Sequence, residues 1–125
     1  MNVIEQQRPA ATEIPGCAHV TLAGHADGLS ELSLWRETLS PGASTPLHRH
    51  DCDEVVLCLG GFGEVHSEGR IERFGVDCTV VLPKNRDHQI FNVGPGPLDT
   101  IGVFAATPVM TREPDGAPMA LPWRT

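Results

Sequence analysis

The sequence predicts an all-β single domain, a double-sheet jelly-roll barrel that is also called a double-stranded β-helix. The length of 125 residues suits one domain. Thirteen glycines and eleven prolines interrupt the chain at short intervals, and short apolar runs lie between these breaks. About ten short strands without a convincing helix are typical of a closed or nearly closed antiparallel barrel.

The composition argues against several classes of partner. The formal net charge is -7, with 9 basic and 16 acidic residues, so no basic surface for nucleic acid is expected. No apolar run approaches the roughly 20 residues that span a bilayer. Residues 1–9 lack the charged start and the apolar stretch of a secretory signal peptide. We therefore expect a cytoplasmic protein without a nucleic-acid or membrane partner.

The four cysteines, Cys17, Cys52, Cys58 and Cys78, show no Cys-x2-Cys pairing. An even number is compatible with disulfides in a secreted chain, but without a signal peptide reduced thiols are the better interpretation. The spacing also excludes a zinc ribbon.

The first part of the chain is predicted as an N-terminal arm over residues 1–16, either loose or lying on the surface or on a partner. Residues 17–22 form the first short strand, and residues 24–29 have the composition of a turn. His19 and His25 fall in this region, and we expect both on the surface.

The next strand covers residues 31–39, with apolar residues at 32, 34 and 35, and ends at the Ser-Pro-Gly turn of residues 40–42. Arg36 and Glu37 lie in its middle. One of them should face the barrel interior and the other the outside, and the pattern does not decide which. The alternative for both is an exposed cross-strand ion pair, which would contribute little stability.

A hairpin with potential metal ligands follows. His48 and His50 are two residues apart, so a strand over residues 46–50 aims both imidazoles at one face. A short loop then turns the chain, and Glu54 begins the apolar run of residues 55–59. Two imidazoles and a carboxylate that converge on one point suit a divalent transition metal.

Alternation assigns faces to this second strand. If Glu54 faces inward, Val56 and Cys58 do so as well, while Val55, Leu57 and Leu59 point outward. An outer stripe of branched apolar residues needs a cover, either from the terminal segments or from a second subunit. We therefore expect a homodimer.

Further short strands are expected over residues 62–67, 70–74, 78–82 and 98–106, with another beginning near His88. His88 follows a proline turn and is the fourth candidate ligand. The barrel thus covers residues 17–106. Residues 107–125 form a proline-rich C-terminal tail, which we expect to dock on the barrel or on a partner, because a free tail would expose Leu121 and Trp123.

Two stretches resemble the two motifs of the cupin superfamily. The first, Gly-x5-His-x-His-x3-Glu-x6-Gly, is matched at Gly42, His48, His50, Glu54 and Gly61. The second, Gly-x5-Pro-x-Gly-x2-His-x3-Asn, is matched at Pro83, His88 and Asn92, while Asp77 and Asn85 stand at its two glycine positions. Asparagine tolerates a left-handed turn better than most residues.

The resemblance covers roughly residues 32–106 and identifies the chain as similar to small, single-domain metal-binding cupins of the cupin 2 type. It implies the same jelly-roll barrel and pairing through an outer sheet face. No internal repeat is visible, so one cupin domain is expected.

The predicted ligand set is His48, His50, Glu54 and His88 around one divalent metal. Zinc would form a closed tetrahedral site with these four ligands. Manganese, iron, nickel or cobalt would be octahedral with two open positions, and we expect these metals rather than zinc or copper. The single carboxylate leaves the centre positively charged, which favours an anionic or enolisable small-molecule substrate.

The strand pattern proposes Val56, Cys58, Leu82, Ile90 and Phe104 as apolar walls of the cavity. Arg86 precedes His88 and is a candidate for orienting a substrate carboxylate at the mouth; a solvated loop arginine is the alternative.

Three functions fit these features. The first is a metal-dependent oxygenase or dioxygenase acting on a small oxygenated molecule, a reaction class that the cupin resemblance implies to be common. The second is a non-redox isomerase, cyclase, lyase or decarboxylase. The third is a non-catalytic module that binds a metal or a small molecule. Since fold does not settle function, metal identity and O₂ uptake distinguish them.

Overall fold

The computed structural model describes residues 1–125, which form eleven strands and one short 3-10 turn. The strands are β1 (Ala10–Ala11), β2 (Cys17–Ala23), β3 (Ser33–Leu39), β4 (Arg49–His50), β5 (Glu54–Gly60), β6 (Gly63–Ser67), β7 (Arg70–Phe74), β8 (Thr79–Leu82), β9 (His88–Asn92), β10 (Leu98–Phe104) and β11 (Thr111–Arg112). The 3-10 turn η1 covers His25–Asp27.

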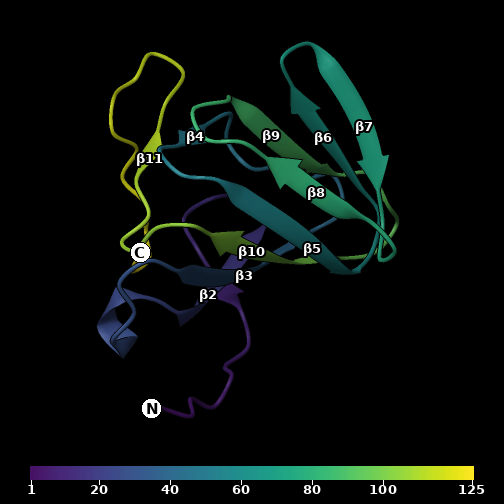
Figure 1. Ribbon diagram of the computed structural model, residues 1–125. Helices are drawn as coiled ribbons and strands as arrows, with labels where there is room; N and C mark the ends of the chain where they lie inside the picture. The colour runs from purple at the N-terminus through teal and green to yellow at the C-terminus, as the bar shows by residue number, and fades with distance from the viewer.

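The strands form a large and a small antiparallel sheet. The large sheet has six strands in the order β1-β2-β3-β10-β5-β8, and the small one has three in the order β7-β6-β9. A two-stranded ribbon, β11-β4, lies at one end of the barrel (Figure 1). The predicted all-β jelly roll is therefore confirmed.

Side chains of the large sheet alternate between a buried and an outer face, as period two requires. In β5, Glu54, Val56 and Cys58 are buried. Leu57 and Leu59 lie on the outer face and are 41% and 48% exposed. The face assignment made from the sequence for this strand is confirmed.

Two apolar clusters fill the space between the sheets. The larger comprises Cys17, Leu39, Val56, Cys58, Phe74, Val80, Leu82, Ile90 and Leu98. The smaller comprises Trp35, Cys52, Phe104 and Val109, with Leu121 and Trp123 packed against it. Members of both clusters line the same cavity as His48, His50 and His88.

The turn before β9 uses a left-handed residue. Asn85 has φ 63°, a conformation that glycine and asparagine adopt most readily. Its backbone N–H donates to the carbonyl of His50 over 2.8 Å. The asparagine at this motif position thus keeps the turn, and its backbone N–H connects the turn to the segment that contains His48 and His50.

Both terminal segments are attached to the barrel. In the N-terminal segment, β1 pairs with β2. In the C-terminal segment, β11 pairs with β4. The chain end returns to β2, where Arg124 donates to the carbonyl of Thr21 (3.2 Å), and it also binds Asp27 of η1 (3.1 Å) (Figure 1). No helix in the structure has the length and apolar character needed to cross a membrane.

One prediction about β2 was wrong. His25 is exposed, but His19 is 6% exposed and points into the molecule. Its ring stacks on the indole of Trp123, with centroids 3.9 Å apart. The inner face of β2 and the returning tail together bury this histidine, and the sequence of β2 alone does not reveal the tail.

Candidate metal centre

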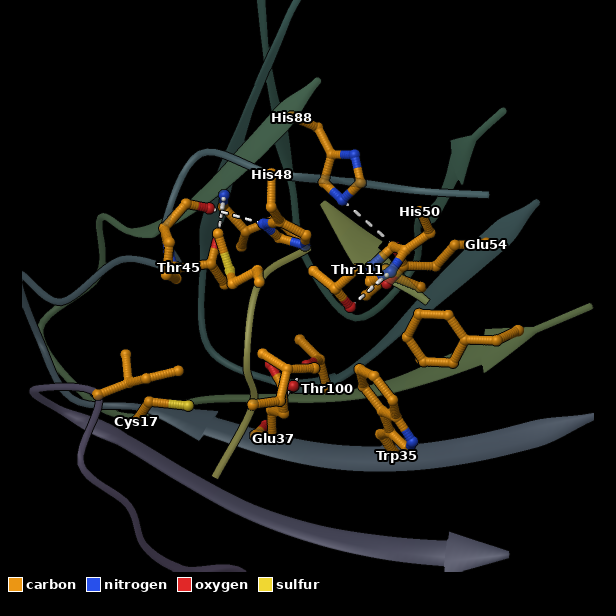
Figure 2. Close-up of a pocket in the computed structure, with 18 of the residues that line it drawn as sticks. Cys17, Trp35, Glu37, Thr45, His48, His50, Glu54, His88, Thr100 and Thr111 are labelled. Carbon is orange, nitrogen blue, oxygen red and sulfur yellow. Dashed lines mark hydrogen bonds and ion pairs between the residues drawn. The ribbon is translucent and has the colours of Figure 1, made fainter. Parts of the chain in front are cut away.

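Three histidines from two neighbouring segments meet inside the barrel. His48 and His50 come from the segment that ends in β4, and His88 begins β9, which pairs with that segment at His48. One ring nitrogen from each of the three residues lies within 4.8 Å of the others. Figure 2 shows the three rings directed at a common point, so this group can hold a metal ion.

Backbone carbonyls fix the orientation of each ring. The Nδ1–H of His48 donates to Pro46 O (2.6 Å), and that of His88 donates to Arg86 O (3.0 Å). The Nδ1 of His50 lies 3.2 Å from Met110 O and 3.1 Å from Thr111 Oγ1. A carbonyl only accepts, so Nδ1 carries the proton, and each Nε2 keeps its lone pair for a cation.

Glu54 completes the arrangement from β5. Its Oε2 lies 3.3 Å from His88 Nε2 and 3.4 Å from His50 Nε2, but no donor is aligned with it for a hydrogen bond. A buried carboxylate oxygen without a partner is costly. A divalent cation between Glu54 and the three imidazoles would satisfy it, and one carboxylate with three imidazoles is a suitable donor set for such an ion.

The charges of the site are set by burial and by mutual contacts. Burial lowers the pKa of His48 and brings the pKa of His50 to about 4, so both are neutral near pH 7. Burial would raise the pKa of Glu54, but the neighbouring imidazoles of His88 and His50 outweigh it and hold the pKa below its usual value. Burial likewise opposes protonation of His88, yet Glu54 raises its pKa overall.

The histidines open onto a cavity of about 50 Å³. A water molecule needs about 10–15 Å³ of such space, so the cavity accommodates a few waters or a small organic molecule. Of the predicted wall residues, Val56, Ile90 and Phe104 line it. The remaining walls come from β2, β3, β10, the segment before β4 and the two terminal segments: Ile14, Cys17, Trp35, Glu37, Thr45, Pro46, Thr100, Gly102, Thr111, Met119, Leu121 and Trp123.

Three predicted substrate residues do not line the cavity. Cys58 and Leu82 face inward, as their strand parity requires, but they pack within the larger apolar cluster. Arg86 is exposed on the outside of the barrel, where it forms an ion pair with Glu68. The loop before His88 points its carbonyl, and not its arginine side chain, toward the site.

The structure decides the orientation of the two charged residues in β3. Arg36 faces outward and binds Asp99 of β10 through two contacts of 3.0 and 2.7 Å. Glu37 faces the cavity. The register of β3 against β2 and β10, which the sequence does not specify, places it there.

The tail residues Met119, Leu121 and Trp123 were not predicted as parts of the site, although they line the cavity. The apolar character of Leu121 and Trp123 in a polar, proline-rich segment indicated docking, but no periodicity indicated where. Thr111 was missed for the same reason, since β11 has two residues only.

Comparisons with known proteins identify the family and the fold of the chain. A sequence profile described as auxin-binding protein matches residues 2–112. The chain belongs to the auxin-binding protein family. Auxin-binding protein 1 of Arabidopsis thaliana is 34% identical over 105 residues, which cover 76% of this chain and 53% of that protein. Auxin-binding protein T92 of Nicotiana tabacum is 34% identical over 106 residues, or 75% of this chain and 57% of the relative.

This member of the family spans about half the length of the curated relatives it matches. Among solved structures, the polyketide cyclase RemF of Streptomyces resistomycificus aligns with a TM-score of 0.72 at 23% identity, over 87% of this chain and 83% of its own. A cupin 2 conserved barrel domain protein of Salinispora arenicola aligns with a TM-score of 0.67 at 21% identity, over 82% and 89%. At these identities the likeness establishes the cupin fold, and the cupin resemblance read from the sequence is confirmed.

Proposed function

We propose that this auxin-binding protein family member holds one divalent transition metal through His48, His50, Glu54 and His88 and binds a small organic carboxylate there. The observation that carries the proposal is the convergence of three imidazoles, each anchored through Nδ1, on a buried carboxylate oxygen without a hydrogen-bond partner. The bound metal would supply a Lewis acid with open positions for oxygen ligands.

The charge and the walls of the cavity support an organic anion. One ionised Glu54 against a divalent cation leaves the centre positive, which favours a carboxylate. Trp35, Phe104 and Trp123 offer apolar surface for the hydrocarbon part of the ligand. The relatives are named as auxin-binding proteins, which is consistent with ligand binding as the function of this cavity. An acid larger than the cavity requires the tail residues that line it to move.

Oxidation of the bound molecule by O₂, the activity expected first from the sequence, is a finer proposal for the same centre. The two alternatives are non-redox chemistry and ligand binding without turnover. Oxygen uptake distinguishes oxidation from both alternatives, because only oxidation consumes O₂ when the ligand is added.

Metal analysis of the purified protein tests the proposal, with His50→Ala as the variant. We expect about one equivalent of a divalent transition metal in the parent and little in H50A, because the loss of one imidazole opens the ligand set. His66→Ala, outside the site, is the matched control. An unchanged metal content in H50A would refute the ligand assignment.

Calorimetry with acetate and benzoate then tests the ligand class. Both acids should bind the metal-loaded parent and neither should bind H50A. Equal binding with and without the metal would contradict a metal-anchored carboxylate. An oxygen electrode in the same samples separates oxidation from the non-redox alternatives.

A further inference from the structure

Glu37 is a second carboxylate in the cavity and has no part in the metal ligand set. It rises from β3 on the side that faces the histidines (Figure 2), and its side chain is 20% exposed. Its Oε1 lies 3.4 Å from Nδ1 of His19, and no protein donor reaches Oε2. The second oxygen is therefore free to contact a molecule in the cavity.

The hydrogen bonds of His19 determine where its protons lie. Thr21 Oγ1 lies 2.7 Å from the carbonyl of Arg124, which only accepts, so the single hydroxyl proton of Thr21 is donated there. His19 Nε2 lies 2.9 Å from the same hydroxyl. Since that hydroxyl has no second proton to give, Nε2 of His19 must be the donor.

The remaining nitrogen, Nδ1, faces the carboxylate of Glu37. A neutral His19 with its proton on Nε2 would direct a lone pair at a carboxylate oxygen, which is repulsive. The contact is favourable only when the pair holds one more proton. The indole of Trp123 stacks on the His19 ring at 3.9 Å with an interplanar angle of 11°, and Trp35 meets its edge. An aromatic face stabilises a cation, so the proton belongs on His19.

We propose that Glu37, paired with an imidazolium form of His19, is the acid–base group of this cavity and exchanges a proton with a small enolisable carboxylate, such as a 2-keto acid, bound at the metal. This inference rests on the proposed function. Glu37 is the catalytic residue of this proposal, because it lines the cavity and its free oxygen would contact a molecule bound there. His19 is a positioning residue.

The step is a proton transfer without oxidation or reduction. A C–H bond next to the ligand carbonyl breaks, its electron pair stays on the ligand as an enolate, and the proton forms an O–H bond at Glu37. Return of the proton to the same or a neighbouring atom completes an exchange or an isomerisation. The total charge in the cavity does not change.

The other titratable and charged groups around the pair are few. Cys17 of β2 lines the same cavity, and burial raises the pKa of its thiol to about 12, so it stays protonated. His48 faces Glu37 from across the cavity. Glu5 of the N-terminal segment and Arg124 of the tail border His19 on its outer side.

Nitrogen NMR of the full chain loaded with zinc tests the pair independently of any activity. We expect protons on both ring nitrogens of His19 in the parent, with the signal assigned by its loss in His19→Asn. In Glu37→Gln the amide donates to Nδ1, so His19 should become neutral with its proton on Nε2. A neutral His19 in the parent would overturn the proposal.

Hydrogen–deuterium exchange of the pyruvate methyl group in D₂O tests the proton transfer. The metal-loaded parent should accelerate exchange, and E37Q should be about 100-fold slower, as is typical for loss of a general base, with unchanged metal content. Glu31→Gln, on the surface, should match the parent. No exchange by the parent, or equal rates in the parent and E37Q, would overturn the proposal. A parent that binds no metal would refute the proposed function instead, and the NMR result would still test the pair.

Discussion

His88 differs from the other two histidines of the group in the direction of its pKa shift, which is upward, whereas the pKa values of His48 and His50 are lowered. Its Nε2 is 3.3 Å from Glu54 Oε2, and this carboxylate raises the pKa of His88 although burial opposes the shift. The raised pKa increases the fraction of the metal-free protein in which His88 is protonated. A metal needs the neutral imidazole, so it competes with this proton.

We predict that metal uptake near pH 7 releases protons, and that the metal affinity rises with pH until the raised pKa of His88 is passed. The sign follows from the direction of the shift: below this pKa the proton must leave before the metal binds, and above it no such cost remains. Calorimetric titration with zinc in two buffers of different ionisation enthalpy measures the number of protons released. His66→Gln should behave like the parent, and heats that do not depend on the buffer would contradict the prediction.

The sequence predicts the candidate ligands well at this scale, because their spacing places His48 and His50 on one face and the motif adds Glu54 and His88. Metal binding by these residues stays a prediction. The inward orientation of Glu37, in contrast, could not be predicted from the sequence. Which of two adjacent charged residues faces inward depends on the register of β3, and its partner His19 is buried by a tail that lies about 100 positions away.

At the scale of elements, the β4–β11 ribbon connects the tail to the candidate metal centre. Thr111 pairs with His50 in this ribbon, and its hydroxyl lies 3.1 Å from His50 Nδ1. The carbonyl of Met110 contacts the same nitrogen. The tail thus orients the imidazole of His50 through its Nδ1, the ring nitrogen on the opposite side from the candidate metal position.

We predict that Thr111→Val weakens zinc affinity about 10-fold, at the lower end of the effect of losing a residue that orients a metal-bound histidine. Valine has nearly the same shape, and the Met110 carbonyl still accepts from Nδ1, so the fold should persist. Competition with a fluorescent chelator measures the affinity. Thr79→Val, on the exposed face of β8, serves as the control, and equal affinity in T111V and the parent would refute the orienting role.

Alternating polarity in the sequence predicts the longer strands, but it does not predict the two-residue strands. β1, β4 and β11 are too short to show a period. Their pairing depends on which segments the barrel brings together. This is why the tail was expected to dock but could not be assigned a position.

At the scale of the whole molecule, the outer face of the large sheet stays uncovered. Leu57 lies across from Ile101 and Thr79, and Val55 lies across from Val103 and Val81. Val81 is 68% exposed, and Leu57 and Leu59 are 41% and 48% exposed, so the tail does not shield them. The alternative that the chain covers its own stripe is therefore wrong.

We predict that the protein is a homodimer that pairs through this face. Covering apolar surface contributes about 25 cal/mol per Å², which must outweigh the entropy cost of association. Leu57→Glu should yield monomer or aggregate by light scattering, whereas the parent should have twice the mass of the 13.4 kDa chain. Ile71→Glu, on exposed strand β7 of the other sheet, should stay dimeric. A parent mass near 13.4 kDa would rule the dimer out.

The aromatic walls of the cavity also determine how the protein absorbs and emits light. The chain has two tryptophans and no tyrosine, and both indoles line the cavity beside the histidines. Near-ultraviolet absorbance and intrinsic fluorescence therefore originate almost wholly at this one place. A metal or a ligand entering the cavity changes the surroundings of every strong chromophore in the molecule at once, so the unmodified protein carries its own optical reporter of occupancy.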